Sequence, residues 1–239
     1  MLDEKILVTG GKGLLATNLK KHFPKATFVD KDEFDITNYQ MMENYLSEKN
    51  VKLIIHCAAY TSVAEAEKNI DILLDTNIIG AANVVKICAK NGIKLVYIST
   101  DYVFSGDKGL YKEDDPLLPV NKYAWSKLGG ECAAHLYENS LIIRTSFGSN
   151  PFPYPSAFVD QWTSREKVSV VAKKIAELIK KGATGIFHVG GERKTVYEFA
   201  KSIDPSKDIG KRSIKELDVK LPKDTSLDTT KFEKFFEAQ

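Results

Sequence analysis

A tyrosine and a lysine at i,i+4 spacing are the strongest candidates for chemistry in this sequence. Tyr123 and Lys127 begin a segment, Tyr123–Asn139, that is predicted to be a helix. This spacing places both side chains on one helical face. A phenol with its ordinary pKa of about 10 is a poor proton donor or acceptor at neutral pH. A nearby ammonium lowers that pKa, so the pair predicts a group that exchanges a proton with a carbonyl or carbinol oxygen.

Two hydroxyl residues follow the strand that is predicted at Lys94–Ile98. Ser99 and Thr100 stand directly after its last residue, and ligands bind at the carboxyl ends of such strands. The Thr100 hydroxyl is placed to donate to the same oxygen as Tyr123. We therefore predict Thr100, Tyr123 and Lys127 as a catalytic set. The alternative is a tyrosine and a lysine on the surface, because the pattern YxxxK is common by chance.

A glycine-rich turn follows the first predicted strand. The glycines Gly10 and Gly13, followed by Ala16, form a GxxGxxA pattern that also contains Lys12 and Leu14. The glycines allow a tight turn and a close approach of the backbone to a pyrophosphate. The first turn of the following helix favours an anion. The segment predicts a dinucleotide site rather than an empty turn.

An acid closes the second predicted strand at Asp30, at the position expected for an acceptor of the ribose hydroxyls. A carboxylate there repels a 2′-phosphate and favours NAD. The next residue, Lys31, could bind that phosphate instead. The sequence leaves both cofactors, NADPH or NADH, open.

Strands and helices alternate along most of the chain. Short apolar strands that are each followed by a helix predict an α/β fold with a doubly wound parallel sheet of the Rossmann type. The expected strands are Lys5–Thr9, Ala26–Asp30, Leu53–Cys57, Lys94–Ile98, Leu141–Arg144 and Ile186–Val189, and the expected helices are Leu14–Phe23, Tyr39–Lys49, Ile70–Ala89, Tyr123–Asn139, Lys173–Lys181 and Val196–Ile203.

The alternation breaks at two places. Prolines at every second position of Asn150–Pro155 exclude a regular helix, and after Gly190 the chain becomes polar and loop-rich. We expect residues 1–149, with 166–190 returning to them, to form an NAD(P)-binding Rossmann domain. Residues 150–165 and 191–239 are then a small, shortened C-terminal substrate lobe.

Composition narrows the class of protein. The net charge of +2 argues against a nucleic-acid surface. The three cysteines are widely spaced and form no CxxC pair, as expected of reduced thiols in a reducing compartment. No histidine pair has metal-ligand spacing. We expect a cytoplasmic protein with no metal and no membrane association.

The residues above resemble the extended short-chain dehydrogenase/reductases, and within them the dTDP-4-dehydrorhamnose reductase family. The resemblance covers nearly the whole chain, and its most specific segments are Ser99–Gly106 and Tyr123–Glu131. The other matching segments are Thr9–Ala16, Phe34–Thr37, Ala58–Val63, Leu141–Ser146, Gly185–Gly190 and Ser226–Lys231. The resemblance implies hydride transfer from NAD(P)H to the 4-keto group of a nucleotide-linked 6-deoxysugar.

The resemblance also assigns roles to single residues. It makes Thr100, Tyr123 and Lys127 catalytic, with Lys127 also holding the nicotinamide ribose. The further implied cofactor residues are Asp35, Ile36, Ala58, Ala59, Thr61 and Ser99, and those implied to face the sugar are Val63, Asp101 and Tyr102. Tyr102 suits a packing role equally well. Asn77 matches a structural asparagine of the superfamily, and the alternative is an ordinary exposed residue.

The sequence also departs from the family pattern. Ala64 replaces a usual acid, Phe147 replaces a frequent tryptophan, and the stretch between Arg144 and Lys173 is short. The family normally inserts a longer helical segment there to build the sugar-nucleotide pocket. We expect Phe147 to contact the substrate and Arg165 to meet a phosphate. The alternative is that the aromatic residues of this stretch cover a sheet edge or a subunit interface.

Three functions remain open at this level. The leading one is the 4-keto reductase. The second is an epimerase, dehydratase or reductase of the same superfamily that acts on a smaller substrate. The third is a non-catalytic, dinucleotide-binding regulatory subunit, because the resemblance extends to the beta subunit of methionine adenosyltransferase. The superfamily commonly forms homodimers through the helices expected at Ile70–Ala89 and Tyr123–Asn139.

Overall fold

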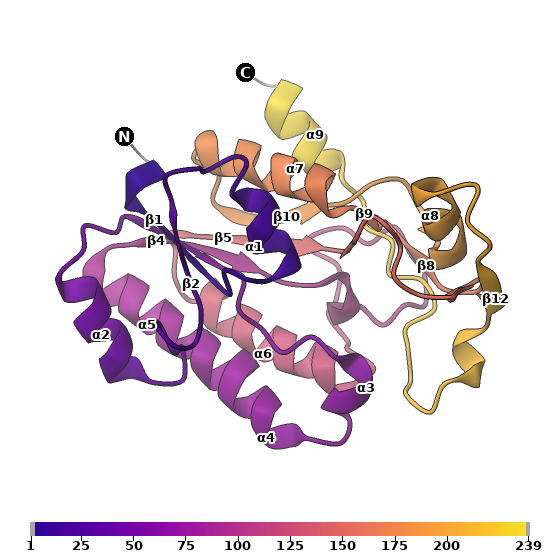
Figure 1. The fold of residues 1–239 in the computed structure, drawn as a ribbon, viewed down its shortest axis with the longest axis horizontal. Helices are drawn as coiled ribbons and strands as arrows, with labels where there is room; N and C mark the ends of the chain where they lie inside the picture. Colours follow the sequence, from indigo (N-terminus) through magenta and orange to yellow (C-terminus); the bar gives the residue numbers. More distant parts are fainter. Residues whose placement is uncertain (1–2, 238–239) are drawn as a thin grey trace.

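The structure, a computed structural model, describes residues 3–237 and is built on one large parallel sheet (Figure 1). Its six strands lie in the order β10-β5-β4-β3-β1-β2. They are β1 (Ile6–Thr9), β2 (Thr27–Val29), β3 (Leu53–His56), β4 (Lys94–Ile98), β5 (Ser140–Thr145) and β10 (Gly185–Val189). The chain turns from β1 to β2 on one side and to β3 on the other, so the carboxyl ends of β1 and β3 flank the crevice where such sheets bind ligands. The predicted doubly wound α/β fold is confirmed.

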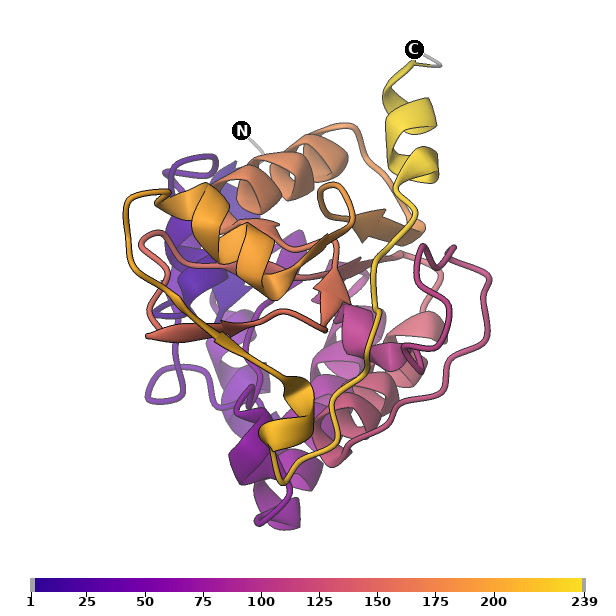
Figure 2. The ribbon, with the colours of Figure 1, turned by 90° about the vertical axis from the view of Figure 1, so that its right-hand side faces the viewer.

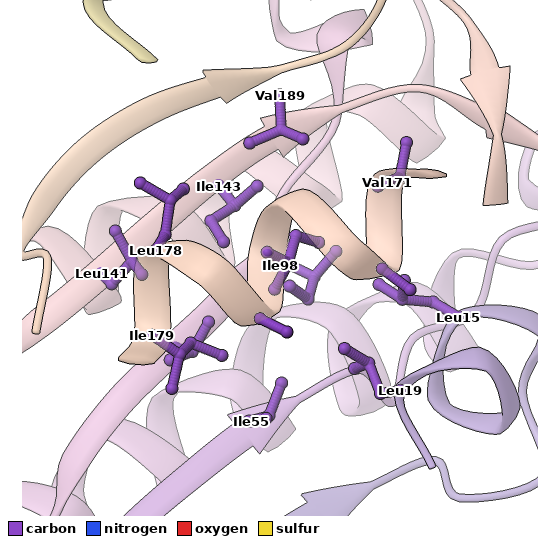
Figure 3. Packing of buried hydrophobic residues seen from close by; sticks show 14 of the residues in the cluster. Leu15, Leu19, Ile55, Ile98, Leu141, Ile143, Val171, Leu178, Ile179 and Val189 are labelled. Carbon is purple, nitrogen blue, oxygen red and sulfur yellow. The ribbon is translucent and has the colours of Figure 1, made fainter. Parts of the chain in front are cut away.

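Helices cover both faces of the sheet (Figure 1). One face carries α1 (Leu14–Leu19), α7 (Val168–Lys180) and α9 (Thr230–Glu237), and the other carries α2 (Tyr39–Ser47), α5 (Ala81–Asn91) and α6 (Lys122–His135). Strand residues alternate between the faces. Leu15 of α1, Val171 of α7 and Ile55 of β3 meet on the first face (Figure 3), whereas Leu7 of β1 packs with Val84 of α5 on the second.

A long helical run leads into α5. It begins with α4 (Ile70–Ile72), continues as a π-helical segment η2 (Leu73–Gly80) and ends at Asn91. By length and composition, the run Ile70–Asn91 is long and apolar enough to cross a membrane. It packs against α6 and the sheet, however, and part of it is buried there, as in a core helix of a globular protein.

A small lobe lies beside the carboxyl edge of the sheet, to the right in Figure 1 and in front in Figure 2. Its elements are β7 (Ser156–Phe158), β8 (Trp162–Thr163), β11 (Lys194–Thr195), α8 (Val196–Ile203), β12 (Gly210–Arg212) and η4 (Ile214–Glu216). Phe152, Ala157, Phe199 and Ile209 form its own core. Residues of the stretch 150–165 and of the first part of 191–239 thus pack together.

The last part of the chain leaves this lobe. After η4 it runs extended past the loop that follows β4 (Figure 2), forming bridges at Tyr111–Leu227 and Trp162–Asp224. It ends in α9, whose Phe232 joins the core between α7 and the sheet. The expectation of a loop-rich tail is wrong for Thr230–Glu237. Phe232, Phe235 and Phe236 stand at helical spacing and pack on the Rossmann domain, Phe235 against Phe187 of β10.

Candidate active site

Two adjoining hollows open at the carboxyl ends of the central strands. The larger has a volume of about 460 Å³ and the smaller about 270 Å³, and Gly13, Cys57 and Ala59 line both. The larger also reaches the ends of β4 and β5 and the lobe. The pair therefore forms one continuous groove across the switch point of the sheet.

The glycine turn lies where the two hollows meet. Gly10 has φ +65°, and a Cβ atom built there would lie 2.9 Å from the backbone nitrogen of Ala58. A Cβ atom at Gly13 would lie 3.0 Å from the Gly10 carbonyl oxygen. The first turn of α1, with its unpaired N–H groups, faces the larger hollow through Leu14, Leu15 and Ala16. Because these glycines have no side chains, the turn leaves room for the pyrophosphate of a dinucleotide. The site therefore fits NAD(P).

A buried histidine, which the sequence analysis missed, ties β1 to β3 below this turn. Thr9 Oγ1 lies 2.8 Å from His56 Nδ1 and accepts a hydrogen bond from the Ala58 amide at 3.3 Å. Burial lowers the pKa of His56 to about 3, so the ring is neutral and shares one hydrogen bond with the Thr9 hydroxyl. This link holds Ala58 and Ala59 against the glycine turn.

The smaller hollow is lined by several of the predicted cofactor residues. Gly10, Asp30, Lys31, Asp35, Ile36, Ala58 and Ala59 all line it, together with Phe34, Thr37 and Thr76, which were not predicted. Asp30 accepts a hydrogen bond from the Lys12 amide at 3.3 Å, and the Lys12 ammonium lies 3.9 Å from its carboxylate. The Lys12 side chain is 83% exposed and lines neither hollow.

The three predicted catalytic residues all line the larger hollow. Tyr123 stands in the first turn of α6, which Asn121 caps by accepting a hydrogen bond from the Ala124 amide at 2.9 Å. Thr100 caps a short turn after β4 by accepting a hydrogen bond from the Tyr102 amide at 3.2 Å, and its hydroxyl donates to Asp101 at 3.2 Å. Lys127 donates from Nζ to the carbonyl of Ile98 at 2.8 Å. Hydroxyl, phenol and ammonium thus converge on one cavity.

Burial controls the protonation of this set. It raises the pKa of Tyr123 well above its ordinary value, against the opposing hydrogen bond from Thr100. It lowers the pKa of Lys127 to about 8, although Glu131 acts in the opposite direction. The expectation that the neighbouring ammonium sets a lowered tyrosine pKa is therefore wrong for the free protein. The phenol keeps its proton, which suits it as a proton donor.

Asn77 is a structural residue, and the alternative of an exposed position is wrong. It is buried in the π-helical segment η2. Its Oδ1 accepts from the Tyr60 amide at 2.8 Å, while Nδ2 donates to the Tyr60 carbonyl at 3.0 Å and to the Ser126 hydroxyl at 2.8 Å. These hydrogen bonds fix the loop that carries Ala59 and Thr61 beside α6.

The residues expected to contact the substrate line the larger hollow too: Val63, Thr100, Asp101, Tyr102, Phe147 and Arg165. The carboxylate of Asp101 is already occupied, since it accepts hydrogen bonds from Thr163 at 3.2 Å and Thr225 at 2.7 Å. Asp101 thereby joins the strand end to the lobe. Thr61 and Ser99, expected at the cofactor, also line this hollow.

Some lining residues had no signal in the sequence. Thr145 at the end of β5 and Ser146 after it contribute to the larger hollow, whereas Tyr154, which also lines it, belongs to the aromatic stretch for which substrate contact was one of two expectations. The Ser146 hydroxyl accepts a hydrogen bond from Arg165 Nε at 3.4 Å. Among residues 3–237, no group of three or more His, Cys, Asp or Glu side chains is arranged to hold a metal ion.

The fold and this groove define an NAD(P)-binding Rossmann protein of the short-chain dehydrogenase/reductase class. The family described as RmlD substrate binding domain matches residues 4–239. The chain belongs to this family, that of the dTDP-4-dehydrorhamnose reductases.

Individual relatives agree with this placement. The chain is 32% identical to a dTDP-4-dehydrorhamnose reductase of Aggregatibacter actinomycetemcomitans, over 83% of this chain and 78% of that protein. The crystal structure of dTDP-4-dehydrorhamnose reductase from Bacillus anthracis in complex with NADP superimposes with a TM-score of 0.84 at 30% identity, covering 98% of this chain and 99% of that one. The chain is also 26% identical to methionine adenosyltransferase 2 subunit beta of Pongo abelii, over 97% of this chain and 82% of that protein.

Proposed function

We propose that this protein is an NAD(P)H-dependent reductase that converts the 4-keto group of a nucleotide-linked 6-deoxysugar into an alcohol. The observation that carries the proposal is the phenol of Tyr123, whose pKa burial raises, in the same cavity as Thr100, Lys127 and the glycine turn. The dTDP-4-dehydrorhamnose reductases among its relatives support the substrate class.

Each catalytic side chain has a distinct task in this reaction. A bound NAD(P)H supplies the hydride for the carbonyl carbon. Tyr123 donates its phenolic proton to the carbonyl oxygen, and Thr100 orients that oxygen. The Lys127 ammonium stabilises the phenolate that remains, until solvent returns the proton.

The groove assigns two ends to the bound molecules. Gly10, Gly13, Asp30 and Ala58 would hold the pyrophosphate and adenosine side of the cofactor. At the other end, Arg165 would contact the diphosphate of the substrate, and the rings of Phe147 and Tyr154 would pack on its base or sugar. The short lobe leaves Tyr154 62% exposed at this rim, so substrate is expected to cover it.

The test is reduction of a dTDP-linked 4-keto-6-deoxysugar, followed through NADH or NADPH absorbance. Tyr123→Phe should lower kcat by about 10²–10⁴-fold, because it removes the proton donor but keeps the ring. Tyr197→Phe, on α8 and outside both hollows, is the matched control and should retain full turnover. Wild-type protein without turnover on any nucleotide-linked 4-keto sugar would refute the proposal.

A regulatory role is the second candidate, and the similarity to methionine adenosyltransferase 2 subunit beta favours it. Such a subunit would bind NAD(P) and a larger enzyme without turning over a sugar. Stable co-purification of a catalytic partner, combined with equal properties of wild type and Tyr123→Phe, would support this role over the reductase.

Location and assembly belong to the same proposal. We place the protein in the cytoplasm, where its free thiols Cys57, Cys88 and Cys132 stay reduced. We also propose a homodimer, because the helical run Ile70–Asn91 and the adjacent α6 expose Ile70, Ile79 and Trp125. Exposed apolar side chains on two neighbouring helices are typical of a subunit interface.

A further inference from the structure

Helix α6 is joined to the end of β4 by contacts with three successive residues, the last of which directly follows the strand. Tyr97 donates from its hydroxyl to the Lys127 carbonyl at 3.0 Å, and Lys127 Nζ donates to the Ile98 carbonyl at 2.8 Å. The Ser99 hydroxyl donates to the carboxylate of Glu131. The next residue along the chain is Thr100. On α6, Glu131 follows Lys127 by one helical turn. Glu131 therefore contacts the immediate neighbour of one catalytic residue and shares a helical face with another.

Glu131 forms a buried ion pair with Arg144. Arg144 of β5 donates to its Oε1 from two nitrogens, at 2.7 and 3.0 Å, and both side chains are almost wholly buried. Arg144 also donates to the Glu113 carbonyl at 3.0 Å. The guanidinium binds one carboxylate oxygen and the Ser99 hydroxyl binds the other, so both oxygens of Glu131 are held in place.

The groups that surround the Lys127 ammonium determine how strongly the Glu131 carboxylate acts on it. The ring of Tyr97 lies 4.5 Å from Nζ, and the charge of Lys127 also acts on His56 of β3 and on Cys57, the residue after it. Tyr123 stands one turn before it on α6. Burial keeps His56, Cys57 and Tyr123 uncharged at neutral pH. Burial lowers the pKa of Lys127, and the Glu131 carboxylate is the largest effect that opposes this shift.

We propose that Glu131 is a positioning residue, which keeps the Lys127 ammonium charged and fixes Ser99, and with it Thr100, against the catalytic helix. It touches neither hollow, so it acts through these neighbours. The effect on turnover rests on the reductase function proposed above, whereas the effect on Lys127 does not.

The first test measures Lys127 directly in the cofactor-free protein. NMR titration of ¹³Cε-lysine protein, with the signal assigned through Lys127→Met, should give a midpoint of about 8 in the wild type. In Glu131→Gln the midpoint should fall by roughly one unit, because removal of a nearby negative charge favours the neutral amine. An unchanged midpoint in folded Glu131→Gln would overturn the proposal.

Removing one partner of a buried ion pair can unfold a protein. The double variant Glu131→Gln, Arg144→Met avoids an unpaired buried guanidinium and should still lower the Lys127 midpoint. If the double variant is folded and keeps the wild-type midpoint, the proposal fails as well.

The second test separates alignment from charge. Ser99→Ala keeps both charges, so the Lys127 midpoint should stay within about 0.2 units, while kcat should fall several-fold as Thr100 loses its anchor. In Glu131→Gln the alkaline limb of the kcat profile should move to lower pH with the NMR midpoint. A shifted midpoint in a protein without any sugar reductase activity would refute the proposed function and leave the role of Glu131 intact. Full activity of Ser99→Ala would refute the alignment of Thr100.

Discussion

The glycine turn shows how one residue type can be required for two separate reasons. Gly10 and Gly92 both have positive φ, at +65° and +62°. A side chain at Gly10 would press on the backbone of Ala58, whereas a side chain at Gly92 would have no atom within 4 Å. Gly92 ends α5 and is needed only for its left-handed backbone conformation. Gly10 is also needed to keep the cofactor groove open.

These two glycines form a matched pair for an experiment. Gly10→Ala should weaken NADH binding at least about ten-fold, which corresponds to about 1.4 kcal/mol, because β1 and β3 must separate. Gly92→Ala should cost about 1–2 kcal/mol of folding free energy through its left-handed backbone alone and leave NADH affinity unchanged. Calorimetric titration with NADH, beside thermal unfolding, measures both. Equal affinity of the two variants would show that the Gly10 turn does not hold the cofactor.

At the scale of elements, α6 is held closest to its neighbours at one glycine. A Cβ atom at Gly130 would lie 2.5 Å from the Asn77 carbonyl oxygen and collide with the Tyr97 hydroxyl. A Cβ atom at Gly129 would meet only the Ile78 side chain, at 3.0 Å. Gly130 therefore permits the close packing that brings Lys127 and Glu131 onto β4.

Gly130→Ala should destabilise the protein by about 3 kcal/mol, the upper end of overpacking effects, and lower its Tm by roughly 6–12 °C. Gly129→Ala should change the free energy of unfolding by no more than about 1 kcal/mol, because alanine favours a helix and Ile78 can move. Differential scanning calorimetry of both variants measures the difference. Similar melting temperatures would mean that α6 and η2 are not tightly packed at Gly130.

The sequence predicted the helices and strands better than the contacts between them. The period of apolar residues predicted β4 and α8 with their observed ends, and the YxxxK spacing predicted that Tyr123 and Lys127 face one cavity. The helix predicted from Lys173 begins five residues earlier, at Val168. Val168, Val171 and Ala172 pack in the core of the sheet, and this burial cannot be known from the sequence before the sheet is known. The links from Glu131 to Ser99 and Arg144 join three elements, so no local pattern reveals them.

At the scale of the whole molecule, the lobe and the sheet are joined by the extended segment before α9. Thr225 of this segment and Thr163 of β8 both donate to Asp101, the residue after Thr100 in the proposed catalytic set. Gln161 donates to the Tyr102 hydroxyl at 2.8 Å and to the Pro222 carbonyl at 3.2 Å. A substrate that binds between the lobe and the sheet would therefore contact residues, Asp101 and Tyr102, whose side chains these hydrogen bonds already fix.

The outer surface of α6 and of the helical run Ile70–Asn91 carries the proposed dimer interface. Trp125 of α6 is 52% exposed, next to the helical run that exposes Ile70 and Ile79. Burying these side chains against a second copy would remove apolar area from water at about 25 cal/mol per Å². Trp125→Glu would place a charge in that interface and should convert a dimer into a monomer in sedimentation velocity experiments.

Leu118→Glu is the matched control, because Leu118 is 58% exposed in the loop before α6, outside the proposed interface. It should leave the sedimentation coefficient unchanged. NADH binding should survive in both variants, since neither residue lines the groove. A wild-type protein that sediments as a monomer at concentrations of tens of micromolar, or a Trp125→Glu variant that stays dimeric, would exclude this face as the interface.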